Sequence, residues 1–242
     1  MLQEATEEFR QATDPNDLWK HLHRQLSRLG ITGLIYGAKA LETNLHDPAI
    51  ILDSLPPDYL ATKLQEGGLE HDEFVHAGLT QTAPILWDEN SVPAQRLADF
   101  SPEARRSLDI DWSFGVTTGV TLPMRFSGGL GSSLLGCHAA ETSWGEFGRM
   151  WQEHDSTVVG IAHAFDVALR RDHMGHLFPL SSEERECLLW LAAGLQQKQI
   201  ADRLRLTDRQ VEKRFSSIRG KMKATTTTQA MASALILGLI TP

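Results

Sequence analysis

The C-terminal quarter of the chain carries the pattern that most constrains its fold. Ser181-x-x-Glu184 and Thr207-x-x-Gln210 are both capping boxes, in which two side chains satisfy the free amides at the start of a helix. Apolar residues follow the second box at the spacing of one buried helical face: Val211, Phe215, Ile218 and Met222. The sequence therefore predicts short helices that pack on one another.

Four helices are expected between residues 181 and 242. The first begins at Ser181 and ends before Gly194, which suits a left-handed C-terminal cap. The others are Lys198–Leu204, a helix that starts at Thr207, and about Thr227–Leu237. Two short helices joined by a tight turn, the second of them basic on one face, fit the major groove of DNA. The pattern therefore predicts a helix-turn-helix.

The polar face of the third helix supplies the predicted DNA contacts. Side chains near its N-terminal half are placed to reach base edges: Gln210, Lys213, Arg214 and Ser217, with Arg209 on the same face. Lys198, Arg219 and Lys221 are better placed for phosphates, which position a protein without reading sequence. A helical bundle with a solvated charged face is the alternative. The capping boxes, the turn and the single basic face favour DNA.

The charge distribution agrees with this interpretation. Residues 1–179 contain 13 Lys and Arg against 25 Asp and Glu, a net charge of −12. Residues 180–242 contain 10 against 6, a net charge of +4, and the two parts together give the chain's −8. An acidic body with a basic C-terminal piece is expected when only the second part meets phosphates.

The stretch from Leu180 to Ala224 resembles the helix-turn-helix of LuxR-type regulators. Glu184, Leu188 and Gly194 fall on hallmark positions of that family. Gln199 and Arg214 depart from its usual Glu and His, and Gln210 from its usual Thr. These departures alter base reading or capping more than the fold. The resemblance covers about a quarter of the chain and implies a transcription factor rather than an enzyme.

The region before this helix-turn-helix alternates helices and strands. Helices are expected over residues 3–29, 58–64 and 142–171, and strands over 31–40, 49–55, 116–124 and 132–138. This order predicts an α/β fold, with an N-terminal α/β/α sandwich and a C-terminal four-helix bundle. The expected domains are residues 1–171 and 181–242, joined by a linker at 172–180. The apolar stripe of the last helix, which includes Phe147, Val158 and Ile161, is expected to contact a second copy.

The N-terminal region resembles, more weakly, the autoinducer-binding domain of quorum-sensing LuxR regulators. The frame includes Tyr59, Lys63, Asp72 and Trp87, with Gly119 four residues before a proline. In that family the Asp accepts the signal's amide hydrogen, one Trp donates to the lactone carbonyl, and a second Trp packs on the ring. A phosphorylation receiver is disfavoured, because no paired acids follow the first strand.

The resemblance implies a site for a small, largely apolar signal, either an acyl-homoserine lactone or a related molecule. The candidate ligand-binding residues are Tyr59, Lys63, Asp72, Trp87, Gly119 and Leu135. Tyr59 replaces the family's first Trp, and Lys63 replaces a Tyr. A buried, unpaired ammonium is costly. Lys63 is therefore expected to point to solvent, to pair with Asp72 or Glu73, or to bind an acidic ligand group.

The remaining expectations concern partners and compartment. No apolar run is long enough for a membrane helix, and no cysteine or histidine spacing indicates a metal site, so we expect a cytoplasmic protein without metal or cofactor. A homodimer on an inverted-repeat DNA site is the expected assembly. The alternative is a ligand-independent regulator of the same type, whose N-terminal domain serves only dimerisation or protein–protein contact.

Overall fold

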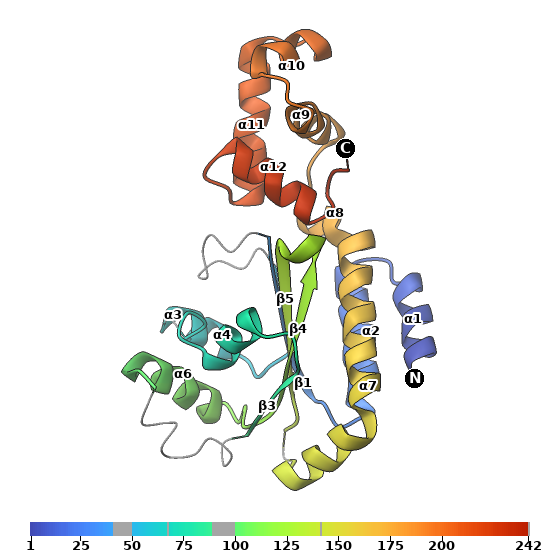
Figure 1. Ribbon diagram of the computed structural model, residues 1–242, viewed down its shortest axis with the longest axis vertical. Coiled ribbons are helices and arrows are strands. Elements are labelled where there is room, and N and C mark those ends of the chain that lie inside the picture. Colours follow the sequence, from blue (N-terminus) through green and yellow to red (C-terminus); the bar gives the residue numbers. More distant parts are fainter. Residues whose placement is uncertain (41–49, 67, 89–99, 141, 242) are drawn as a thin grey trace.

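Figure 1 shows a computed structural model of the chain, which describes residues 1–40, 50–66, 68–88, 100–140 and 142–241. A mixed α/β domain occupies one end, and a group of helices, α9 to α12, occupies the other. No helix among these residues is long and apolar enough to cross a membrane.

The N-terminal domain is built on a five-stranded antiparallel sheet with the order β2-β1-β5-β4-β3. Its strands are β1 (Gly33–Ala40), β2 (Ile50–Asp53), β3 (Ile85–Asp88), β4 (Thr118–Phe126) and β5 (Gly131–His138). The hairpin between β4 and β5 turns at η1 (Ser127–Gly129), where Gly128 and Gly129 have positive φ. Glycine suits such positions because it lacks a Cβ.

Helices cover both faces of this sheet (Figure 1). On one face lie α1 (Leu2–Gln11), α2 (Pro15–Ser27) and α7 (Trp144–Ala168). On the other lie α3 (Tyr59–Gln65), α4 (Glu73–Thr80) and α6 (Pro102–Ser113). The predicted α/β/α sandwich is confirmed.

The apolar stripe of α7 does not form a free surface for a second copy, so that prediction is wrong. Phe147, Val158 and Ile161 are at most 1% exposed. They belong to the same buried cluster as residues of the sheet, α1 and α2, and α7 packs on β4. The helix buries this stripe within its own domain because the sheet offers an apolar face at that side.

The C-terminal bundle contains α9 (Ser182–Ala192), α10 (Gln197–Leu204), α11 (Asp208–Met222) and α12 (Thr227–Ile236). Both predicted capping boxes are present, at Ser181 with Glu184 and at Thr207 with Gln210. The stripe from Val211 to Met222 on α11 is buried as predicted. The predicted four-helix helix-turn-helix bundle is therefore confirmed.

The junction between the two parts is helical for most of its length. Residues 172–180, predicted as the linker, continue α7 through a π-helical turn, η2 (Leu169–His173), and α8 (Met174–Leu177). The β4–β5 hairpin also contacts α12, since Ser127 Oγ donates a hydrogen bond of 2.8 Å to the Ile236 carbonyl. This second contact joins the sheet directly to the C-terminal bundle.

Candidate functional site

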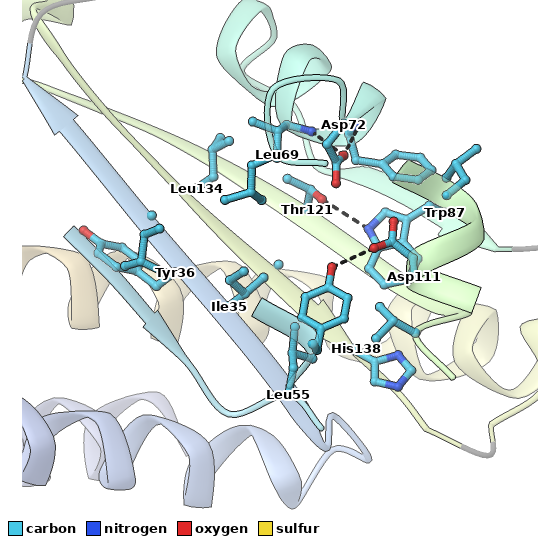
Figure 2. A pocket seen from close by; sticks show the side chains of 18 of the residues that line it. Ile35, Tyr36, Leu55, Leu69, Asp72, Trp87, Asp111, Thr121, Leu134 and His138 are labelled. Carbon is cyan, nitrogen blue, oxygen red and sulfur yellow. Dashed lines mark hydrogen bonds between the residues drawn. The ribbon is translucent and has the colours of Figure 1, made fainter. Parts of the chain in front are cut away.

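A cavity of about 140 Å³ lies between the sheet and the helices α3, α4 and α6. Most of its lining side chains are apolar, among them Ile35, Leu55, Leu69, Phe74, Val75, Trp87, Leu108, Val116 and Leu134. Tyr59, Asp72 and Asp111 place polar groups on its wall (Figure 2). A mainly apolar cavity with a few converging polar groups is typical of a small-molecule site.

Lys63 lies behind this wall and is fully buried. Its Nζ donates to the Ser107 carbonyl at 3.0 Å and to Asp111 Oδ1, and it is 3.0 Å from Asp72 Oδ2. An ammonium has three protons to donate. Of the options predicted for Lys63, the structure shows pairing with Asp72, and Asp111 is a second carboxylate partner.

Asp72 uses both of its carboxylate oxygens within the protein. Oδ1 accepts hydrogen bonds from the backbone amides of Phe74 (2.9 Å) and Val75 (3.0 Å), so Asp72 caps the start of α4. Oδ2 faces the Lys63 ammonium. Asp72 lines the cavity, but its oxygens are already engaged with helix amides and with a cation.

Asp111, on α6, links the two halves of this polar cluster. Its Oδ1 accepts a hydrogen bond of 2.7 Å from the Tyr59 hydroxyl as well as the bond from Lys63. Burial and the nearby charge of Asp72 raise the pKa of Asp111 to about 6. Burial lowers the pKa of Lys63, but the nearby carboxylates of Asp72 and Asp111 have the larger effect, so the pKa of this lysine is raised overall.

Trp87 forms an aromatic wall on another side of the cavity (Figure 2). Its indole Nε1 donates to Thr121 Oγ1 at 3.2 Å, and its ring stacks on that of His138 with centroids 6.4 Å apart. His138 Nδ1 lies 3.1 Å from the Thr118 carbonyl. Burial lowers the pKa of His138, so this histidine is neutral at pH 7 and its Nδ1 carries the proton.

Gly119 and Leu135, both predicted ligand contacts, do not line the cavity. Gly119 pairs with Trp87 across the sheet, and a Cβ there would lie 2.7 Å from the Trp87 ring. Its role is therefore to leave room for that ring. Leu135 is fully buried in the core on the other face of the sheet. Successive strand residues point to opposite faces, so Leu134 lines the cavity instead. The Leu135 prediction is wrong.

The polar cavity residues that were not predicted include Asp111, Thr121 and His138. Asp111 shares a helical face with Ala104, Ser107 and Leu108, all buried, and an acid on such a face signals a buried partner. His138 shares its strand face with Leu134 by alternation. The sequence showed which helix or strand face carries each of these side chains. It did not show their partners, because those lie on elements distant in the chain.

The raised pKa of Asp111 predicts a specific pH dependence of stability. In the unfolded chain this carboxyl ionises near its ordinary pKa of 3.8, whereas in the folded protein it does so near 6. Between these values the folded state binds more protons, so the contribution of Asp111 to stability falls as pH rises. The unfolding free energy of the wild type, relative to Asp111→Asn, should fall by at most about 3 kcal/mol from pH 4 to pH 7.5. Urea unfolding at a series of pH values measures this, and a pH-independent difference would contradict it.

The predicted DNA contacts lie on α10 and α11, at the far end of the molecule from the cavity (Figure 1). The side chains of Lys198, Arg209, Lys213 and Ser217 are exposed. Gln210 is exposed too, but its Oε1 accepts from the amide and hydroxyl of Thr207 in the capping box. Arg209, Gln210, Lys213 and Ser217 present a polar surface on α11, the second helix of the helix-turn-helix, and Lys198 lies on the first, α10.

Three predicted DNA contacts have partners within the bundle. Lys221 Nζ is 2.7 Å from the buried Glu184 carboxylate and also donates to the Pro179 carbonyl. Arg219 donates to Thr227 and Glu212. Arg214 is half-buried, with Nη1 4.0 Å from Cys187 Sγ. Lys221 therefore stabilises the bundle whatever its contact with DNA.

Comparison with known protein families assigns both parts of the chain. Residues 14–166 match the autoinducer binding domain family, and residues 179–234 match the bacterial regulatory proteins of the luxR family. The chain therefore belongs to the LuxR-type quorum-sensing transcriptional regulators, as the sequence motifs predicted. Members of this family are transcriptional regulators and not enzymes.

Relatives match along nearly the whole chain. The transcriptional activator SolR of Ralstonia solanacearum is 25% identical over 248 residues, covering 98% of both chains. The quorum sensing-dependent regulator RpaR of Rhodopseudomonas palustris is 28% identical, over 76% of this chain and 72% of that protein. Escherichia coli SdiA has the same fold, with a TM-score of 0.59 and 15% identity over 100% of this chain and 98% of that one. A structure of SdiA in complex with octanoyl-rac-glycerol gives a TM-score of 0.57.

Proposed function

We propose that the N-terminal domain senses a small, largely apolar molecule and that the chain binds an inverted-repeat DNA site as a homodimer. The observation that carries this proposal is the mainly apolar cavity between the sheet and α3, α4 and α6. Acyl-homoserine lactones belong to the proposed ligand class, as do other small apolar molecules. The SdiA complex with octanoyl-rac-glycerol supports a ligand of this kind in the same fold.

The cavity residues take different roles in this proposal. Trp87 packs on the ligand, and Asp72 and Tyr59 lie on the wall that faces it. Lys63 acts through the carboxylates that it holds, because it is not on the cavity surface. Ligand binding controls DNA binding only if the ligand favours the DNA-competent state over others.

The contact between α12 and the β4–β5 hairpin supports coupling between the two domains. Besides the Ser127–Ile236 hydrogen bond, the Arg170 guanidinium lies 4.4 Å from the centre of the Phe126 ring. Arg170 also pairs at 2.6 Å with the buried Asp166 of α7. A shift of the sheet on ligand binding would therefore reach α12 through Ser127 and the helical junction through Phe126.

A ligand-independent regulator is the second candidate, and the polar cluster favours it. Tyr59, Lys63 and Asp72 already have hydrogen-bond or ion-pair partners without any ligand. In that case the cavity would be a packing defect, and the N-terminal domain would serve only dimerisation or contact with another protein.

Selection of DNA from a random library, followed by measurement of affinity and stoichiometry, tests the DNA half of the proposal. We expect an enriched site with two-fold symmetry, with half-sites about one helical turn apart, bound by two copies. Enrichment of an asymmetric site, or binding by a single copy with full affinity, would overturn the homodimer.

Lys213→Ala should weaken binding to the selected site by about 1–3 kcal/mol if Lys213 contacts a base. Lys213 is exposed on α11, so its loss should leave the unfolding free energy within about 0.5 kcal/mol of the wild type. Lys221→Ala is the matched comparison, since it leaves the buried Glu184 without its cation and should destabilise the bundle. Equal weakening of Lys213→Ala on selected and random DNA would assign Lys213 to phosphate instead.

A further inference from the structure

Tyr59 and Lys63, at the polar end of the cavity, have no proton left to offer to a ligand. The Tyr59 hydroxyl donates its single proton to Asp111. Lys63 directs its three to Ser107, Asp111 and Asp72. A ligand carbonyl placed at this end therefore finds acceptors and no donor among these side chains.

The same end of the cavity carries unbalanced negative charge. One ammonium, Lys63, faces two carboxylates, Asp72 and Asp111, each at least nine-tenths buried. The two other charged residues on the cavity wall, Lys39 and Asp88, have opposite signs. Among the described residues, the cluster of Lys63, Asp72 and Asp111 therefore carries a net charge of −1, which the two α4 amides at Asp72 offset only in part.

One carboxylate oxygen is available for a positive group. Both hydrogen bonds to Asp111 end on Oδ1, and within the described part of the chain Oδ2 accepts none. Asp111 and Trp87 both lie on the cavity wall (Figure 2). The raised pKa of Asp111 has the same origin, because burial and a second carboxylate disfavour its charge.

The size and lining of the cavity limit what can carry such a group. A cavity of about 140 Å³ is close to the roughly 150 Å³ of an engineered apolar cavity that binds benzene. A ring or short alkyl chain with one polar substituent, on the order of ten non-hydrogen atoms, fits this space. The Trp87 ring, which contacts the rings of Phe74 and His138, adds an aromatic surface to the same cavity.

From these observations we propose that the cavity selects a small apolar primary amine, whose ammonium donates to Asp111 Oδ2 while its apolar part packs against Trp87. This inference rests on the proposed sensing function and narrows its ligand class. A lactone carbonyl gains no donor from Tyr59 or Lys63, since both are committed to Asp111. An amine supplies a donor for Asp111 Oδ2 and a positive charge that balances the described cluster.

Thermal unfolding with matched probes at pH 7.5 tests the proposal. The probes are phenethylamine, benzylamine and hexylamine, the corresponding alcohols, the carboxylates phenylacetate and hexanoate, and hexanoyl-homoserine lactone. At least one amine should bind roughly tenfold to a hundredfold more tightly than its alcohol, as expected for a hydrogen bond to a charged group. The carboxylates should not stabilise the protein.

Asp111→Asn is the matched variant, because the amide oxygen can still accept from Tyr59 and Lys63 while the net charge of the cluster becomes zero. The preference for amine over alcohol should fall to near unity in this variant. An unchanged preference, or no binding of any amine to the wild type, overturns the inference. If the variant does not fold, the comparison of amines with alcohols on the wild type still tests the inference.

The outcomes also separate this inference from the proposed function. Stabilisation by the lactone or an alcohol, without an amine preference, overturns the amine and leaves a small-molecule sensor. If no probe stabilises the protein, the amine inference fails. The sensing function fails with it if none of these probes changes the affinity for DNA either.

Discussion

Replacing Lys63 with methionine should lower the free energy of unfolding by about 3–5 kcal/mol, the usual loss when one partner of a buried ion pair is removed. Methionine has nearly the length of the lysine side chain but leaves Asp72 and Asp111 facing one another without a cation. The Ser107 carbonyl also loses its donor. Urea unfolding of purified protein measures the loss.

Two comparison variants make this result specific. Lys20→Met removes an exposed lysine of the same domain and should change the unfolding free energy by no more than about 0.5 kcal/mol. Lys63→Met combined with Asp111→Asn should recover part of the loss, because only Asp72 then remains charged, and two helix amides still stabilise it. A loss below about 1 kcal/mol for Lys63→Met would mean that Lys63 is not the buried partner of these carboxylates.

Gly119→Ala should destabilise the domain by about 3 kcal/mol, at the upper end for overpacking. The added Cβ would lie 2.1 Å from the Cys137 carbonyl oxygen and 2.7 Å from the Trp87 ring. A side chain can move away, but the carbonyl belongs to the neighbouring strand β5 and is fixed by the sheet. The neighbouring strands must therefore shift, which displaces Trp87 from the cavity wall.

Gly37→Ala is the control for this substitution. Gly37 lies on β1 of the same sheet and also lines the cavity, but no atom lies within 4 Å of an added Cβ there. Its unfolding free energy should stay within about 1 kcal/mol of the wild type. Equal effects at the two positions would show that the close approach at Gly119 is not what requires a glycine.

The sequence was most informative where local rules decide the structure. The capping boxes at Ser181 and Thr207 and the α11 stripe depend on residues within one or two helical turns of each other. The fold of the C-terminal bundle followed from them. The β4–β5 hairpin was equally local, since its strands flank a glycine turn.

Long-range contacts were the part that the sequence could not settle. The α7 stripe was correctly expected to be apolar, but whether it faces a sheet or a second copy depends on distant strands. Leu134 and Leu135 are neighbours on β5 whose side chains point to opposite faces of the sheet, and only Leu134 faces the cavity. Asp111 lies 48 residues from Lys63 along the chain, so their ion pair appears only once α3 and α6 are packed together.

The affinity of the protein for its selected DNA site, with and without a cavity ligand, tests the central claim most directly. The ligand is whichever of the amine, alcohol or lactone probes stabilises the wild type most. We expect this compound to change the dissociation constant for DNA by roughly fivefold or more, the usual size of coupling between two sites. The same DNA affinity with and without every probe would contradict a ligand-controlled regulator and favour the ligand-independent one.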